Sequence, residues 1–181
     1  MPYDANAVAN FFLDVAKSEA KPLDQMKLQK LVYYANGWHL AIKSKPLIHE
    51  QVEAWRYGPV IPSLRDSFRQ YGDQPIDSPA SYVVPCRREM TSFDEIEEVV
   101  PTIEQGNPAD LGFVRTLLER VWQVYGKYTG IQLSNMTHEQ GSPWDHVHQF
   151  YEGSIPKGTD IPEQVIRDYF VGLTKQKAAN A

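Results

Sequence analysis

The sequence predicts a mainly α-helical, compact single domain with a short strand or a small β-hairpin in the middle of the chain. Two observations support this fold class. Apolar residues recur at helical spacing behind a capping residue in several segments, whereas strand-like alternation is clear only in residues 52–57. The 181 residues, of which 42% are hydrophobic, suffice for one buried core. We therefore expect one domain over residues 1–173 and a frayed tail over 174–181.

The first two predicted helices have the clearest signals. Asp4 is a good N-cap for a helix that ends near Ser18, and its apolar stripe consists of Val8, Phe11, Phe12 and Val15. Asp24 caps a longer helix over residues 25–42, and its stripe consists of Leu28, Leu31, Val32, Ala35, Trp38, His39 and Ile42.

The other side of this second helix is the first candidate surface. It carries Gln29, Lys30, Tyr33, Asn36 and Gly37, with Lys27 and Tyr34 on a flank. Lysines in such places are ordinarily a solvated flank whose aliphatic stem covers neighbouring apolar surface. We expect this second face to be available for use.

Residues 52–57 form the predicted strand, which Gly58-Pro59 is expected to end. Trp55 and Arg56 alternate along such a strand, so they cannot both face the core. Pro62 occupies the favoured first position of a helix that stops at Gly72. Together these elements predict a strand, a corner and a helix.

The remaining elements follow from capping residues. A helix begins after Asn107, with Pro108 at its first position, and stops at Gly126. Further helices follow Thr129, Ser142 and Asp160. Residues 73–105 have the weakest pattern, and we expect a pair of short strands or a variable loop laid over the domain.

Composition and charge disfavour several classes of function, although the net charge leaves a local basic patch open. Eighteen basic and twenty-three acidic side chains give a net charge of −5, which disfavours binding to nucleic acid or to an anionic membrane. A single cysteine, Cys86, cannot form an internal disulfide, and no signal peptide or bilayer-spanning run is present. The sequence thus predicts a cytoplasmic protein.

The usual signatures of enzymes are missing, so we expect no catalytic residues, no cofactor and no metal. The chain lacks GxxxxGK, strand-linked GxGxxG, HExxH and paired CxxC motifs. His146 and His148 are two residues apart, which places them on opposite sides of a helix rather than in a chelating pair. Cys86 lies beside two arginines, but a thiol without function is favoured because no base is placed near it.

Two other histidines have a structural and a functional interpretation. His138, next to Glu139 and followed by Trp144, has the residue type of a general base. The favoured interpretation is that His138 bonds backbone carbonyls at a helix end. His39 is expected to be a core histidine with one hydrogen-bond partner.

Three blocks together resemble the Panacea domain, the SocA-like or phage-associated GepA-like antitoxin family. The blocks are residues 26–41 (MKLQKLVYYANGWHLA), 46–72 (PLIHEQVEAWRYGPVIPSLRDSFRQYG) and 133–147 (LSNMTHEQGSPWDHV). Their combination is specific, and the resemblance covers roughly residues 5–170, with the acidic middle segment least similar.

The resemblance implies the neutralising partner of a toxin–antitoxin pair, typically encoded beside its toxin in a bacterium or prophage. Related domains are paired with unrelated toxins, including translation inhibitors and alarmone-synthetase-like enzymes, and one branch acts as an adaptor that delivers its toxin to a protease. We expect a cytoplasmic antitoxin that binds a cognate protein toxin in a hetero-oligomer and masks its active site. The acidic balance of the chain suits a toxin with a basic surface.

The motif residues divide into two expected groups. Scaffold residues, expected from apolar period or turn chemistry, are Leu28, Leu31, Trp38, Gly58, Pro59 and Trp144. The second group contains candidate partner-binding residues, which have polar or amphipathic side chains that core packing does not require. They are Lys27, Lys30, Tyr33, Trp55, Arg56, Tyr57 and His138. The alternatives are a protease adaptor, and a small-ligand module or hydrolase that uses His138, Glu139 and Arg56 in a cleft.

Overall fold

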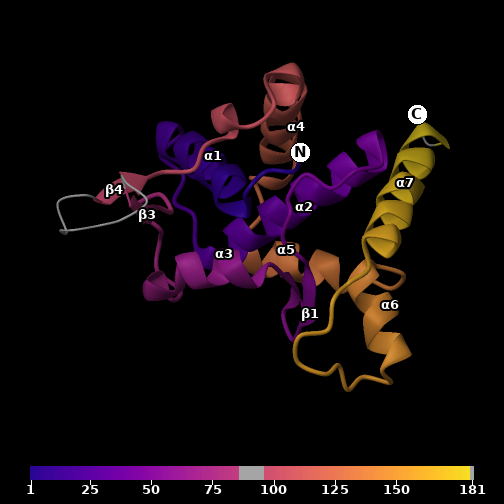
Figure 1. The fold of residues 1–181 in the computed structure, drawn as a ribbon. Helices are drawn as coiled ribbons and strands as arrows, with labels where there is room; N and C mark the ends of the chain where they lie inside the picture. Colours follow the sequence, from indigo (N-terminus) through magenta and orange to yellow (C-terminus); the bar gives the residue numbers. More distant parts are fainter. Residues whose placement is uncertain (86–95, 180–181) are drawn as a thin grey trace.

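The computed structural model describes residues 1–85 and 96–179, which form a mainly helical domain with two small antiparallel sheets (Figure 1). The helices are α1 (Ala5–Ser18), α2 (Gln25–Lys43), α3 (Pro62–Ser67), α4 (Pro108–Tyr125), α5 (Gly130–Thr137), α6 (Pro143–Phe150) and α7 (Glu163–Ala179). Short 3-10 turns cover Arg69–Tyr71 and Ile103–Gln105, and the strands are β1 (Glu53–Trp55), β2 (Gly58–Val60), β3 (Tyr82–Pro85) and β4 (Ile96–Val99). The predicted fold class is confirmed.

Five of the predicted capping residues begin their helices, whereas Asp160 does not: it forms a β-bridge with Glu53, and α7 begins three residues later, at Glu163. Asp4 accepts a hydrogen bond from the backbone N–H of Asn6 at 2.7 Å, and Asp24 accepts one from Lys27 N–H at 2.8 Å. Asn107, Thr129 and Ser142 cap α4, α5 and α6 in the same way. Each cap satisfies one of the backbone donors that a helix leaves unpaired at its N-terminus. Helix α7 continues to Ala179, into the segment that the sequence assigns to a tail.

Helix α2 is the central helix of the domain, and the expected second free face is wrong. Helices α1, α4, α5 and α7 all pack against α2, which Figure 1 shows running through the middle of the molecule. All the residues of the expected free face are buried: Gln29, Lys30, Tyr33, Asn36 and Gly37. The polar side chains of this face can be buried because they form hydrogen bonds with backbone groups of other segments. For example, Asn36 Oδ1 accepts a hydrogen bond from Leu47 N–H at 2.9 Å.

The end of α2 is more exposed than its apolar stripe predicts. Ile42, the last member of the stripe, is exposed, and His39 is half-buried. His39 Nδ1 lies 2.7 Å from Lys45 O, and burial lowers the pKa of its imidazole. His39 is therefore at the margin of the core rather than inside it, and its Nδ1 contacts a backbone partner, Lys45 O.

The strand at residues 53–55 belongs to a hairpin, and the Gly58-Pro59 pair does not end it. Strands β1 and β2 pair antiparallel with Trp55 opposite Gly58, so Arg56 and Tyr57 form the turn between them. Gly58 has φ of 96° and begins the returning strand. The prediction of a strand–corner–helix unit missed β2 because Gly-Pro is usually a chain break, whereas here the glycine supplies the positive φ that closes a hairpin.

The weakly patterned middle of the chain contains the expected pair of short strands. Strands β3 and β4 pair antiparallel from Tyr82 opposite Val99 to Pro85 opposite Ile96. Figure 1 shows this hairpin projecting away from the helical body. Cys86, with Arg87 and Arg88, lies outside the described residues.

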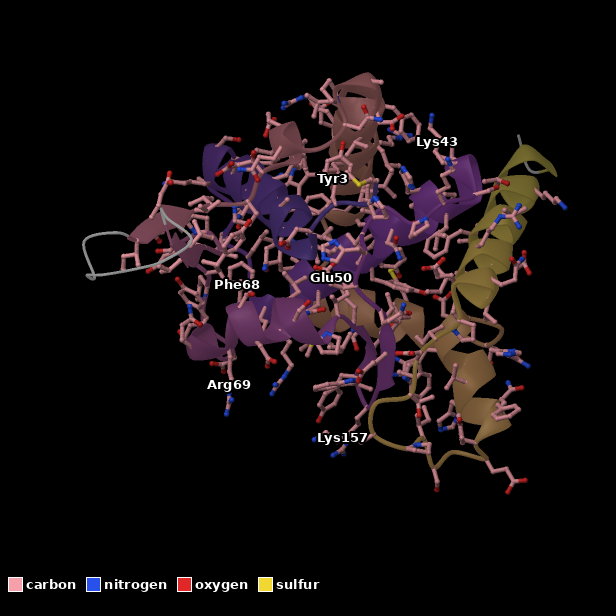
Figure 2. All side chains as sticks on the ribbon, in the orientation of Figure 1. Tyr3, Lys43, Glu50, Phe68, Arg69 and Lys157 are labelled. Atoms are coloured by element: carbon pink, nitrogen blue, oxygen red, sulfur yellow. The ribbon has the colours of Figure 1, made fainter. Side chains whose placement is uncertain are left out.

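The N-terminal segment is tied to the chain beyond α2. Tyr3 N–H donates to Leu47 O at 2.7 Å, and Ala5 N–H donates to the Glu50 carboxylate at 2.9 Å. Figure 2 shows Tyr3 and Glu50 among the packed elements, whereas Arg69 and Lys157 project from the periphery. In the described parts of the chain, no helix has both the length and the apolar character that a bilayer span requires.

Candidate partner-binding site

The β1–β2 hairpin, with Ile61 directly after it, is held by side chains of α2, α5 and α6 and by His138 at the end of α5, which contact backbone carbonyls. The contacts are from Trp144 Nε1 to Trp55 O (2.6 Å), His138 Nε2 to Arg56 O (3.3 Å), Ser134 Oγ to Tyr57 O (2.9 Å), Lys30 Nζ to Pro59 O (2.8 Å) and Gln29 Nε2 to Ile61 O (3.1 Å). Gln29 also accepts from Ile61 N–H at 3.0 Å, so its amide pairs with the backbone as another strand would. The hairpin is too short to be stable alone, and these contacts fix it to α2, α5 and α6.

This arrangement explains why the three sequence blocks occur together. Gln29 and Lys30 come from the first block, the hairpin from the second, and Ser134, His138 and Trp144 from the third. Each block therefore supplies donors or acceptors that another block satisfies. The motif residues that reach the hairpin carbonyls act as its scaffold, whatever further role they have.

Lys30 has the most unusual environment of these residues. Its side chain is only 2% exposed, and the structure gives its ammonium one hydrogen bond, to Pro59 O. Burial in this apolar setting lowers the pKa of Lys30 to about 7. Lys30 is therefore not the solvated flank that its residue type and position on the helix predict, because the hairpin and α5 close over it.

Gly58 brings the hairpin close to Lys30 and α5. A Cβ atom on Gly58 would lie 2.4 Å from Thr137 Oγ1 and 3.1 Å from Lys30 Nζ. Thr137 is buried, and its hydroxyl donates to Ser134 O at 2.7 Å, so it has little room to move. Only glycine meets both the positive φ and the close approach at this position.

We expect Gly58→Ala to lower the free energy of unfolding by about 1–3 kcal/mol, because it adds backbone strain and a clash with Thr137. Urea denaturation measures this change. Gly158→Ala is the matched control, because Gly158 also has a positive φ of 78° but nothing lies within 4 Å of an added Cβ. Equal losses in the two variants would show that the close approach at Gly58 contributes nothing.

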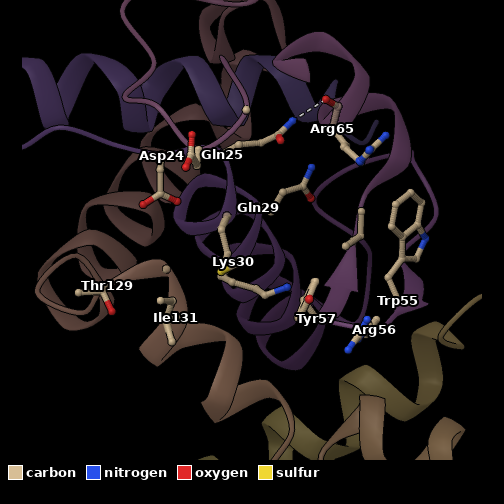
Figure 3. A pocket seen from close by; sticks show the side chains of 15 residues that line it. Asp24, Gln25, Gln29, Lys30, Trp55, Arg56, Tyr57, Arg65, Thr129 and Ile131 are labelled. Atoms are coloured by element: carbon tan, nitrogen blue, oxygen red, sulfur yellow. Dashed lines mark hydrogen bonds between the residues drawn. The ribbon is translucent and has the colours of Figure 1, made fainter. Parts of the chain in front are cut away.

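A groove of about 660 Å³ lies beside the hairpin, between the start of α2, α3 and the start of α5 (Figure 3). Its lining includes Lys30, Trp55, Arg56, Tyr57, Arg65 and Ile131. Two apolar side chains of this lining are strongly exposed, Tyr57 by 59% and Ile131 by 67%. The guanidinium carbon of Arg65 lies 5.2 Å from the centroid of the Trp55 ring, and that of Arg56 lies 5.4 Å from the Tyr57 ring.

The structure brings together most, but not all, of the candidate binding residues. Lys30, Trp55, Arg56 and Tyr57 line the groove, and His138 contacts the hairpin backbone. Lys27 turns away, because its ammonium donates to Gly126 O at 2.7 Å and lies over the Trp122 ring. Tyr33 is buried, with its ring against those of Tyr34 and Phe170.

Sequence reasoning missed Arg65 and Ile131 in the lining of the groove. Arg65 lies in the short helix after the hairpin, and Ile131 lies in the first turn of α5. Ile131 stands two residues after the capping Thr129, and a single apolar residue in the first turn of a helix is not by itself a signal of a contact surface. Its position beside the hairpin depends on tertiary packing and has no signal in the local sequence.

The geometry of His138 favours a structural role over a general base. Its Nδ1 lies 2.7 Å from Ser134 O, and its Nε2 lies 3.3 Å from Arg56 O. Both ring nitrogens thus face backbone carbonyls, and neither presents a lone pair to a cleft. Within the described ranges, no group of three or more His, Cys, Asp or Glu side chains is arranged to hold a metal ion.

Comparison with known proteins gives two matches. Residues 28–145 match the family described as "Antitoxin SocA-like, Panacea domain". A relative, "Antitoxin SocA" of Caulobacter vibrioides (strain NA1000 / CB15N), is 32% identical over 167 residues, which cover 92% of this chain and 82% of the relative. No solved structure matches the chain. The family match spans the hairpin and all five side chains named above that hold it.

Proposed function

Because the chain belongs to the antitoxin SocA-like family of Panacea domains, we propose that it neutralises a cognate protein toxin by binding it directly and masking its active site. The proposed contact surface is the groove together with the tip of the β1–β2 hairpin, and its main residues are Trp55, Arg56 and Tyr57. Neutralisation by masking requires contact area rather than chemistry, since an interface of roughly 1,600 Å² with a few anchors suffices for specific binding.

One observation carries this proposal. The hairpin presents a half-buried Trp and an exposed Arg and Tyr, which are the residue types most enriched at binding hot spots, on a backbone that side chains hold from behind. A surface fixed in this way loses little conformational entropy when a partner binds, and that loss is a main cost of association. The exposed apolar area of Tyr57 and Ile131 supplies the favourable contribution.

Co-expression with the product of the adjacent gene tests the proposal. We expect that product to stop growth when expressed alone and to be tolerated when this chain is present. An immunoblot of the toxin, with its half-life measured after protein synthesis is blocked, separates two mechanisms. Unchanged toxin level supports masking, whereas rapid loss of toxin supports the protease-adaptor alternative.

Two further results would contradict the proposal. An adjacent gene product that is harmless alone would leave nothing to neutralise. Size-exclusion chromatography of the two purified proteins measures their binding. If a variant of this chain no longer binds the toxin but still restores growth, direct binding is not the mechanism. A third result would instead favour a catalytic role for His138. In that case the His138→Ala variant stays folded and binds the toxin but no longer restores growth.

A further inference from the structure

We propose that the groove receives an acidic side chain of the toxin, and that Lys30 at its base forms an ion pair with that carboxylate. This inference rests on the proposed function and specifies the chemistry of the partner. The occupant is a segment of the toxin that places one Asp or Glu among apolar side chains.

The hydrogen bonding of Lys30 is incomplete. A lysine ammonium has three donors, and the structure gives Lys30 a single acceptor, Pro59 O at 2.8 Å. In the parts of the chain that the structure describes, no carboxylate forms an ion pair with Lys30. Figure 3 shows the side chain running from α2 toward the Tyr57 end of the hairpin, inside the groove. A carboxylate in the groove would supply the missing acceptor.

The charges along the groove are separated. Arg56 and Arg65 lie with Lys30 toward the hairpin, while Asp24 lies at the opposite side of the view in Figure 3. Asp24 Oδ1 is committed to the N-cap of α2, and Asp73 is exposed and bonds Gln74. Among the lining residues the positive charges therefore gather at the hairpin side, which complements an acidic side chain; Asp66, 3.5 Å from Arg65, does not line the groove. Apolar lining residues such as Met26 and Val60 complement the apolar toxin residues that surround this acidic side chain.

The desolvation cost that usually cancels the gain from a buried ion pair is smaller at Lys30. Such a pair gains little when both ions must be desolvated on binding. Lys30 is already removed from water in the free protein, so binding desolvates only the carboxylate. Truncating one partner of a buried charge pair typically weakens binding by about 30-fold or more.

Pairing also couples binding to a proton. The pKa of the free Lys30 is about 7, and a carboxylate partner raises it. Below pH 7, Lys30 of the free protein is already protonated, so the affinity for the toxin is at its maximum. Above pH 7, Lys30 must take up a proton when the toxin binds, and the affinity falls by up to about tenfold per pH unit. The other charged or titratable groups around Lys30 are Arg56 and Tyr57 of the hairpin, Arg65 of α3, Asp24 and Asp73 at the groove margin, and His138 after α5.

Lys30→Met tests the inference, with the purified product of the adjacent gene as the probe. Isothermal titration calorimetry at pH 6.5 and pH 8.5 should show binding about 30-fold weaker than wild type at pH 6.5, and loss of the pH dependence. Lys27→Met is the matched control, because Lys27 is also on α2 and also bonds one backbone carbonyl, but lies outside the groove. It should bind the toxin as wild type does.

A double-mutant cycle identifies the partner carboxylate. Each Asp and Glu of the toxin is changed to its amide, and one of these changes should remove the affinity difference between wild type and Lys30→Met. If Lys30→Met fails to fold, the 13C NMR titration of Lys30 Cε in the wild-type protein gives a separate measurement. The pKa of Lys30 should rise when the toxin binds.

The outcomes separate this inference from the proposed function. Wild-type affinity in Lys30→Met, pH dependence that persists in this variant, or a Lys30 pKa that does not rise in the complex would each overturn the inference while the toxin still binds. Failure of the toxin to bind the wild-type protein at all would contradict the proposed function itself.

Discussion

Replacing Tyr57 by alanine is expected to weaken toxin binding by about 30-fold or more, the effect of losing a hot-spot aromatic residue. Tyr57 lies at the tip of the hairpin and lines the groove, and 59% of its surface is exposed in the free protein. Truncation of such an exposed side chain should change the free energy of unfolding by less than about 0.5 kcal/mol. Calorimetry with the purified toxin measures the affinity, and urea denaturation measures the stability.

Phe150→Ala is the matched control for this experiment. Phe150 is also an exposed aromatic residue, with 75% of its surface accessible, but it lies at the end of α6 and does not line the groove. Its loss should leave toxin affinity unchanged. Equal affinities for Tyr57→Ala and the wild type, or equal losses for Tyr57→Ala and Phe150→Ala, would place the interface elsewhere on the molecule.

Phe170→Ala is expected to lower the free energy of unfolding by about 3–5 kcal/mol, the usual cost of deleting a buried phenylalanine ring. Phe170 is fully buried in α7, and its ring contacts those of Tyr33, Tyr34 and Trp38 on α2. The ring also lies directly over Gly37, where an added Cβ would be 2.2 Å from Phe170 Cε2. The absence of a side chain at Gly37 thus lets α7 pack closely on the central helix.

Chemical denaturation of the two phenylalanine variants checks this prediction. Phe150→Ala should lose less than about 0.5 kcal/mol, because its ring is mostly in water. Gly37→Ala should also destabilise the protein, since the added methyl group overpacks the same contact. A loss below about 1 kcal/mol for Phe170→Ala would mean that α7 contributes little to the fold.

Local signals in the sequence are sufficient to place most helices. Asp4, Asp24 and Thr129 cap their helices as predicted, because capping depends on residues only two or three positions apart. The hairpin was only half predicted. Whether Gly58 breaks a chain or closes a turn depends on the strand that follows, and the three residues of β2 carry no alternating pattern of their own.

The burial of α2 was not predictable from periodicity. Gln29, Lys30 and Asn36 are polar, so the pattern places them at the surface. Their partners are the backbones of Ile61, Pro59 and Leu47, which are distant in sequence. A helix whose polar residues bond other segments internally has the same local pattern as one that faces water, and only the tertiary fold distinguishes them.

The candidate site was predicted in part for a related reason. Trp55, Arg56 and Tyr57 are polar or amphipathic residues that packing does not demand, and all three line the groove. Lys27 and Tyr33 meet the same criterion, but the structure directs them to Gly126 and to the core. Residue type alone does not distinguish a surface residue from one whose partners lie on other elements of the fold.

The hairpin contacts have a consequence for how such a domain can change its partner. The side chains that fix the tip bond the carbonyl oxygens of residues 55–57, and every amino acid carries the same carbonyl. Substitutions at these three positions therefore leave the contacts that shape the tip in place. Under selection, this segment can acquire new specificity without loss of the fold, as the loops of an antibody do on their constant framework.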